Sequence, residues 1–139
     1  MLKISKLLDY ALLVVVTIAK NSDAPYSASK ISEVTGLNLP TVRKLLNLLN
    51  IGGIIISKRG IEGGYALARN ADQISMLDIV KSIETDVNIT ECCDTFKNSC
   101  LMKKCSLHSY WKIVNHKILD MFANTSIDEI LTIEKSNKF

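Results

Sequence analysis

The chain has 139 residues, 47% of them hydrophobic and 22% charged, which is typical of one soluble domain or a small domain with an appendage. The net charge of +3 is too small to define a binding partner by itself. The sequence contains no GxSxG, GxxxxGKS/T or HExxH motif, and its two histidines do not lie near paired carboxylates. None of these catalytic motifs of hydrolases, nucleotidases or metalloproteases is therefore available, and we expect neither enzymatic activity nor a small-molecule substrate.

A near-continuous apolar run, YALLVVVTIA (residues 10–19), predicts a buried first helix over residues 5–20. The run is shorter than the about 20 apolar residues that a transmembrane helix needs. Asp9 interrupts the approach to the run and no small-x-small cleavage site directly follows it, which disfavours a secretory signal. We expect a cytoplasmic protein without a membrane partner, in which thiols stay reduced.

Two shorter helices are predicted next. A polar break around Pro25 leads into a helix over residues 29–35, which Gly36 ends as a C-cap. A third helix carries Pro40 in its first turn, where a missing N–H does no harm, and ends at Gly52-Gly53.

The second half begins with a hairpin. Residues 54–57 and 65–68 are expected to be strands around the basic, glycine-rich tip KRGIEGG. SMLD resembles a capping box and predicts a helix from Ser75 to about Glu84. An irregular cysteine-containing segment follows, then a long amphipathic helix over residues 106–123 and a short one over residues 126–131. The apolar stripe of the long helix comprises Trp111, Val114, Ile118 and Met121.

This order of elements predicts a mainly α fold with a small β-hairpin: a winged helix-turn-helix (residues 1–84), followed by a cysteine loop and a long C-terminal dimerisation helix (residues 85–139). The segment from Pro40 to Arg69 contains five basic residues and one acidic residue, Glu62. It therefore carries a net charge of +4, and the remainder of the chain carries about −1. A local basic surface on a near-neutral chain indicates a nucleic-acid-binding face.

The second helix of a helix-turn-helix presents its N-terminal residues to base edges in the major groove. Arginine can bind guanine bidentately and asparagine can bind adenine, so Arg43 and Asn47 are candidates for base contacts, while Lys58 and Arg59 at the wing tip suit phosphate or minor-groove contact. Gly60, Gly63 and Gly64 would let the backbone approach DNA. The predicted DNA-binding residues are Asn38, Thr41, Arg43, Lys44, Asn47, Lys58, Arg59 and Gly60.

All four cysteines lie in ECCDTFKNSCLMKKCSLH (residues 91–108). Gaps of six and four residues separate Cys93, Cys100 and Cys105, and the absence of CxxC weakens a structural zinc site. Thiolates together with the imidazole of His108 form a soft ligand set that suits an iron–sulfur cluster. From spacing alone a cluster is favoured, while zinc, a thiol switch and an unliganded loop stay open.

The stretches SKRGIEGGYALAR (residues 57–69) and ISKLLDYAL (residues 4–12), with three cysteines leading into a long helix, resemble the Rrf2 family of winged-helix regulators. The similarity runs from Met1 to about Leu131, and the wing pattern RGxxGGYxLxR is quite specific. The resemblance implies a homodimer formed through the long helix, a partly palindromic DNA operator and an iron–sulfur cluster. WKIVNHKILDMFANTSIDEI further resembles members that regulate SUF-type cluster-assembly genes.

Carried over from the family, the metal ligands would be Cys100, Cys105, one of Cys92 and Cys93 (Cys92 preferred), and His108 as the fourth. Some nitric-oxide-sensing relatives instead use an acidic residue of the first helix of the other subunit, which Asp9 matches. Pro40, Thr41 and Arg43 depart from the recognition helix of the cluster-binding members, so their operator cannot be transferred.

The resulting prediction is a cytoplasmic, homodimeric regulator that binds double-stranded DNA, carries a 2Fe–2S rather than a 4Fe–4S cluster and controls cluster-assembly genes. A nitric-oxide-sensing repressor with a 4Fe–4S cluster and a zinc- or thiol-based redox regulator are the alternatives.

Overall fold

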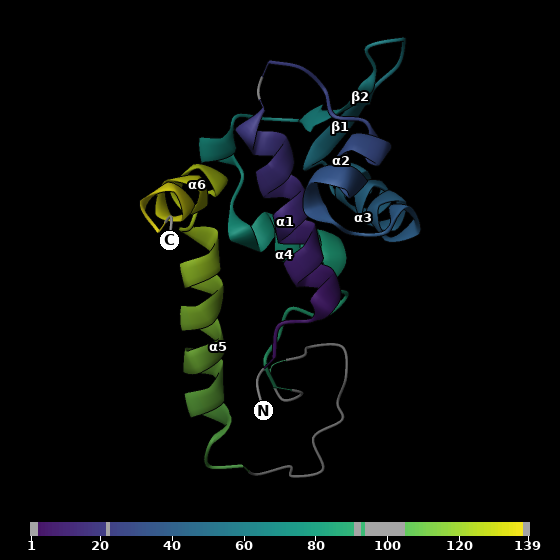
Figure 1. Ribbon diagram of the computed structural model, residues 1–139. Coiled ribbons are helices and arrows are strands. Elements are labelled where there is room, and N and C mark those ends of the chain that lie inside the picture. Colours follow the sequence, from purple (N-terminus) through teal and green to yellow (C-terminus); the bar gives the residue numbers. More distant parts are fainter. Residues whose placement is uncertain (1–2, 22, 91–92, 94–104, 138–139) are drawn as a thin grey trace.

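The computed structural model describes residues 3–21, 23–90, 93 and 105–137. Its described elements run, in chain order, as α1 (Lys6–Lys20), α2 (Ala28–Thr35), α3 (Leu39–Ile51), β1 (Ile55–Lys58), β2 (Gly64–Leu67), the 3₁₀ turn η1 (Ala71–Gln73), α4 (Met76–Ile83), α5 (His108–Ala123) and α6 (Ile127–Ser136). Figure 1 shows α1 to α4 gathered around one core, with the hairpin projecting from one end and α5 at the side. The predicted mainly α fold with a small hairpin is confirmed.

Most helices begin at a polar side chain that caps the first turn. Ser5 Oγ accepts from the Leu8 N–H, Ser27 Oγ from the Lys30 N–H, and Asn38 Oδ1 from the Thr41 N–H. These contacts satisfy backbone donors that the first turn leaves unpaired. α1 and α2 therefore start within one residue of their predicted positions, and Pro40 lies in the first turn of α3 as expected.

The turn between α2 and α3 depends on Gly36, which caps α2 in the left-handed conformation with φ of 75°. Ser32 Oγ also donates to the Leu37 carbonyl at 2.6 Å, so the turn is held from within. Because both ends of the turn are fixed, the angle between α2 and α3 is defined by local sequence, as a helix-turn-helix requires.

The wing is an antiparallel hairpin in which Ile55 pairs with Leu67 and Lys58 with Gly64. It has a third, one-residue partner that the sequence did not reveal. Tyr26 exchanges two backbone hydrogen bonds with Tyr65, at 3.0 and 2.7 Å. The loop before α2 therefore extends the wing sheet and attaches the wing to the helical body.

The capping box predicted at SMLD is confirmed at the start of α4, where Ser75 and Asp78 exchange reciprocal bonds. Near α6, the Met76 N–H donates to the Thr125 carbonyl at 2.8 Å and the Ile127 N–H to that of Ile74 at 2.9 Å. These two bonds lock the α5–α6 connection onto the start of α4.

One core holds the structure together. It consists of α1 residues such as Val14 and Val15, the inner face of α3, the end of the α3–β1 connection at Ile54, and Ile127 and Leu131 of α6. The expected burial of α1 on most sides is confirmed, although Leu12 and Ala19 are only partly buried.

Two helix boundaries differ from the prediction. α6 continues to Ser136, five residues beyond the expected end, and the Lys20 ammonium lies 2.5 Å from the Glu134 carboxylate on its extension. α5 begins at His108 rather than at residue 106, so His108 is its first helical residue.

Candidate nucleic-acid interface and metal-binding segment

The recognition helix α3 separates its residues by face. Val42, Leu45, Leu46 and Leu49 are buried against the body, whereas Arg43, Lys44 and Asn47 are exposed and Thr41 is half-buried. Leu48, next to this buried face, is only partly buried. The structure thus places the predicted base-reading side chains together on the solvent side of α3, within its first three turns.

Asn38 has a structural role in addition to its predicted contact with DNA. Its Oδ1 accepts a hydrogen bond from the Thr41 N–H at 2.9 Å and so caps α3. The side chain remains exposed at the start of the helix. Since helix N-termini favour anionic groups, this end of α3 is suited to a DNA phosphate as well.

The wing carries its positive charge at the tip. Lys58, Arg59 and Gly60 are all exposed, and Ile61 beside them is fully exposed at 108%. Gly60 has a φ of +117° and open space around it. The tip is therefore a projecting basic loop without a protein partner for its side chains among the described residues.

Gly63 and Gly64, the other two wing glycines, are required for a structural reason that differs from the predicted approach to DNA. A Cβ at Gly63 would lie 2.5 Å from the Lys58 carbonyl oxygen, and a Cβ at Gly64 would lie 2.5 Å from the Tyr26 carbonyl carbon and oxygen. Their lack of a side chain is thus required by the hairpin turn and by its attachment to Tyr26. Proximity to DNA is not needed to explain them.

Of the predicted metal ligands in the cysteine segment, the structure describes Cys93, Cys105 and His108. Both thiols are free and half-buried. Cys93 Sγ accepts from the Thr90 hydroxyl at 3.1 Å. The Cys105 carbonyl accepts the His108 N–H at 3.3 Å, so these two predicted ligands are one turn apart at the start of α5.

The predicted ligands Cys92 and Cys100 lie outside the described residues. Within the described part of the chain, no three His, Cys, Asp or Glu side chains gather closely enough to hold a metal ion. Asp9 is exposed in the first turn of α1. The neighbouring Ser5 hydroxyl hydrogen-bonds to the Glu84 carboxylate, so the start of α1 lies beside the end of α4, from which the chain continues to the cysteines.

The donors that are described fit a thiophilic metal group. Cys93 and Cys105 are not consumed by a disulfide, and both are partly shielded from water. Leu107 provides no side-chain cap for α5, and the positive end of the helix dipole there favours a thiolate nearby. This donor chemistry suits an iron–sulfur cluster or a zinc ion.

Asn115 is the only residue of α5 that is buried, and the sequence did not single it out. Its Oδ1 accepts from the Ile89 N–H at 3.0 Å, and its Nδ2 donates to Asn88 Oδ1 at 3.0 Å. Its burial could have been inferred from its place beside Val114, where a polar residue interrupts the apolar stripe of the helix. Asn115 therefore ties the long helix to the segment that leads into the cysteines.

The remainder of α5 leaves large apolar side chains on its surface. Tyr110, Ile113 and Met121 are each 56–57% exposed, and Leu107 just before the helix is 54% exposed. Single exposed apolar residues are common, but several along one helix mark an interaction surface. Among the described residues, none of the helices combines the length and the apolar character needed to cross a membrane.

A helix-turn-helix followed by a basic wing defines a winged-helix DNA-binding protein. A family model described as Rrf2, an iron-dependent transcriptional regulator, matches residues 4–133. The chain belongs to the Rrf2 family of transcriptional regulators, as the sequence predicted.

Curated relatives agree with this assignment. The chain is 29% identical over 124 residues to the HTH-type transcriptional regulator IscR of Pectobacterium atrosepticum, covering 88% of this chain and 74% of the relative. It is 28% identical over 133 residues to an HTH-type transcriptional regulator of Aquifex aeolicus, covering 94% and 92%.

Solved structures confirm the fold. CymR, the global cysteine regulator of B. subtilis, superposes with a TM-score of 0.80 at 23% identity, covering 96% of this chain and 98% of CymR. T. potens IscR superposes with a TM-score of 0.79 at 24% identity, covering 99% and 93%. The two neighbours carry different names at the same level of similarity, so the fold does not by itself identify the signal that is sensed.

Proposed function

We propose that this protein is a homodimeric regulator that binds operator DNA through α3 and the wing and represses or activates iron–sulfur assembly genes according to the state of a cluster on the cysteine segment. One combination of features carries the proposal. An exposed basic face on α3 and the wing is joined, in one small chain, to two free, half-buried thiols, of which Cys105 lies three residues before the start of the long helix α5. The IscR-like relatives support the same reading.

The proposed cluster ligands are Cys105, Cys100, one of Cys92 and Cys93, and His108. A cluster of this kind supplies a redox-active, oxygen- and iron-sensitive group whose presence reports on iron–sulfur supply. The chain's own contribution is to present the thiols in reduced form, to favour thiolates at the start of α5, and to orient His108 one turn from Cys105.

The proposed dimer forms through α5. The side chains of Tyr110, Ile113 and Met121 on its exposed face are not covered by any other part of the described chain. Packing these side chains against the same helix of a second copy would remove them from water and would place two recognition helices at a fixed spacing on a partly palindromic operator.

The sensing mechanism follows from the contacts around Asn115. Ligation of the cysteine segment would restrain residues 88 and 89, which hydrogen-bond to α5 through Asn115 and lie a few residues after the end of α4. A change in that restraint shifts the balance between dimer geometries and so operator affinity, for which a coupling of about 1–3 kcal/mol is typical.

The decisive experiment is to purify the protein without oxygen, record its absorbance spectrum and count iron and sulfide. We expect a coloured protein with two irons and two sulfides per subunit if the cluster is 2Fe–2S. Colourless protein free of iron and sulfide would refute cluster sensing, and bound zinc or reversible thiol oxidation would then support the redox alternative.

A second candidate is a nitric-oxide-sensing repressor with a 4Fe–4S cluster. It is favoured by the position of Asp9, which is exposed near the start of α1, beside the end of α4. Asp9→Ala and His108→Ala separate the two proposals. Loss of cluster only in Asp9→Ala supports the second candidate, and loss only in His108→Ala supports the first.

A further inference from the structure

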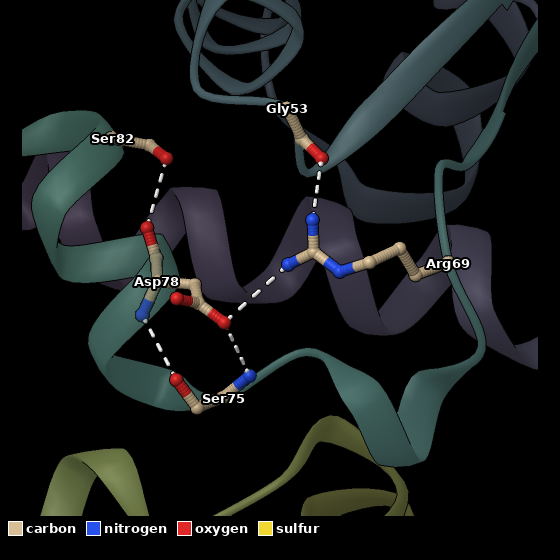
Figure 2. A network of polar contacts seen from close by, with 5 residues as sticks. All are labelled: Gly53, Arg69, Ser75, Asp78 and Ser82. Carbon is tan, nitrogen blue, oxygen red and sulfur yellow. Dashed lines mark hydrogen bonds and ion pairs between the residues drawn. The ribbon is translucent and has the colours of Figure 1, made fainter.

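The guanidinium of Arg69 connects three elements of the DNA-binding half (Figure 2). Arg69 lies two residues after the end of β2, at the base of the wing. Its Nη1 donates to the Gly53 carbonyl at 3.2 Å, directly after α3, and its Nη2 lies 3.5 Å from Asp78 Oδ2 in the first turn of α4. One side chain thus contacts the exit of the recognition helix and the start of the helix behind it.

The carboxylate that receives Arg69 is itself held in place. Asp78 Oδ2 also accepts the Ser75 N–H at 2.9 Å, while the Asp78 N–H donates to Ser75 Oγ at 3.1 Å. The Ser82 hydroxyl donates to the Asp78 carbonyl at 2.9 Å, one turn further on. The acceptor for Arg69 is therefore preorganised, because the capping box fixes the side-chain rotamer of Asp78 independently of Arg69.

The end of α3 is fixed to the same helix by a second contact. A Cβ at Gly52 would lie 2.1 Å from Ser82 Oγ, so the backbone of α3 touches the side of α4 and leaves no room for a side chain. α3 and α4 consequently form one packed unit at this point. Arg69 is the polar group that attaches the base of the wing to that unit.

We infer that Arg69 is a positioning residue, which holds the wing at a fixed place relative to the recognition helix so that both can contact one DNA duplex. This inference rests on the proposed function only in that α3 and the wing bind DNA together. The Arg69–Asp78 pair is about 40% exposed on both sides, and such pairs contribute little to folding stability. A wing that is not held in place would have to be ordered at the moment of binding, which weakens affinity.

The test is a double-mutant cycle on DNA affinity, with a duplex selected from a random pool by the wild-type protein. Arg59→Ala removes the wing's own contact, and Arg69→Ala removes its anchor. We expect each single change to weaken binding about tenfold, and the double variant to bind no more than about twofold more weakly than Arg59→Ala alone. Purely additive losses would overturn the inference, because they would mean that Arg69 does not act through the wing.

Three further variants separate positioning from loss of charge or fold. Asp78→Asn should reproduce part of the loss seen in Arg69→Ala, since the carboxamide oxygen can still accept the Ser75 N–H but no longer forms an ion pair with Arg69. Arg69→Lys should recover part of the affinity. Lys81→Ala removes one positive charge from the exposed side of α4 and should leave affinity within about twofold of the wild type.

A measurement without DNA keeps the inference independent of the proposed function. If the wild type selects no duplex, the proposed DNA binding has failed, and amide hydrogen exchange of the free protein decides. Faster exchange across residues 55–67 in Arg69→Ala than in Lys81→Ala, with exchange in α1 unchanged, supports the anchor. Equal exchange in the two variants overturns it.

Discussion

At the scale of single residues, two glycines of the wing have a positive φ for different structural reasons. Gly60 and Gly64 both have positive φ, at +117° and +156°, but only Gly64 is crowded by another backbone. The first glycine lets the tip turn, and the second lets Tyr26 pair with Tyr65. Substituting alanine at Gly60 and at Gly64 distinguishes these two roles.

Gly64→Ala should destabilise the protein more than Gly60→Ala. Both substitutions strain the backbone, but at Gly64 the added methyl group would also collide with the Tyr26 carbonyl, which costs about 1–3 kcal/mol more. Urea unfolding of the two variants measures the difference. Equal free energies of unfolding would show that the Tyr26 segment simply moves away.

Ile61 allows a change of surface charge that leaves the fold unaltered, because its side chain is fully exposed. Ile61→Lys should keep the free energy of unfolding within about 0.5 kcal/mol and add one phosphate contact, which steepens the salt dependence of DNA binding by about one unit. Titrations over a range of salt concentrations measure the slope.

Ile51→Lys is the matched control for Ile61→Lys. Ile51 is 76% exposed at the last residue of α3, away from the wing tip. A slope that steepens equally in both variants would point to a general effect of charge, and the wing tip would then have no special place in DNA binding.

At the scale of elements, local and long-range features differ in how far the sequence reveals them. The helix starts were predictable because Ser5, Asn38 and Ser75 are capping residues that act on N–H groups three residues away. The end of α6 was missed because its last turns read as a polar tail, although Glu134 on that extension pairs with Lys20 of α1.

The candidate site follows the same division. The exposed basic face of α3 was predictable from helical periodicity, since charged and apolar residues alternate with its 3.6-residue repeat. The contacts of Arg69 and Asn115 join residues 9 to 27 positions apart and have no periodic signature. Long-range polar contacts of this kind depend on the packing of the elements, so only the structure reveals them.

Asn115 should link the stability of α5 to that of the cysteine segment. Asn115→Ala leaves the part-buried Ile89 N–H without its partner, which costs less than the about 3 kcal/mol at the upper end for a fully buried donor. We also expect faster cluster loss, because residues 88 and 89 would no longer be held to α5. Thermal unfolding and the decay of cluster absorbance in air measure the two effects.

Lys117→Ala, on the exposed side of the same helix, serves as the control for Asn115→Ala. Its unfolding and cluster decay should match those of the wild type. Cluster decay that is unchanged in Asn115→Ala, despite lower thermal stability, would show that the anchor supports the fold without supporting the cluster.

At the scale of the whole molecule, most large apolar side chains lie in a single core, yet α5 buries only one residue within the described chain, and that residue is polar. Because helices in proteins are stabilised mainly by tertiary packing, a helix of 16 residues that buries so little of its surface in its own subunit needs a further packing partner. A second subunit is the partner proposed above, and it would turn an exposed helix into the centre of the assembly.

Ile113→Glu tests this assembly. Ile113 is 56% exposed in the single chain, so a charge there should leave the monomer folded but oppose burial of α5 against a second copy. We expect the wild type to sediment as a dimer whose melting temperature rises with protein concentration, and Ile113→Glu to sediment as a monomer with a concentration-independent melting temperature. Ile133→Glu places the same charge at a 51%-exposed isoleucine of α6 and should remain dimeric. If Ile113→Glu stays dimeric while Ile133→Glu dissociates, the subunits meet through α6, and the route proposed from the cysteine segment through α5 to the recognition helices would have to be abandoned.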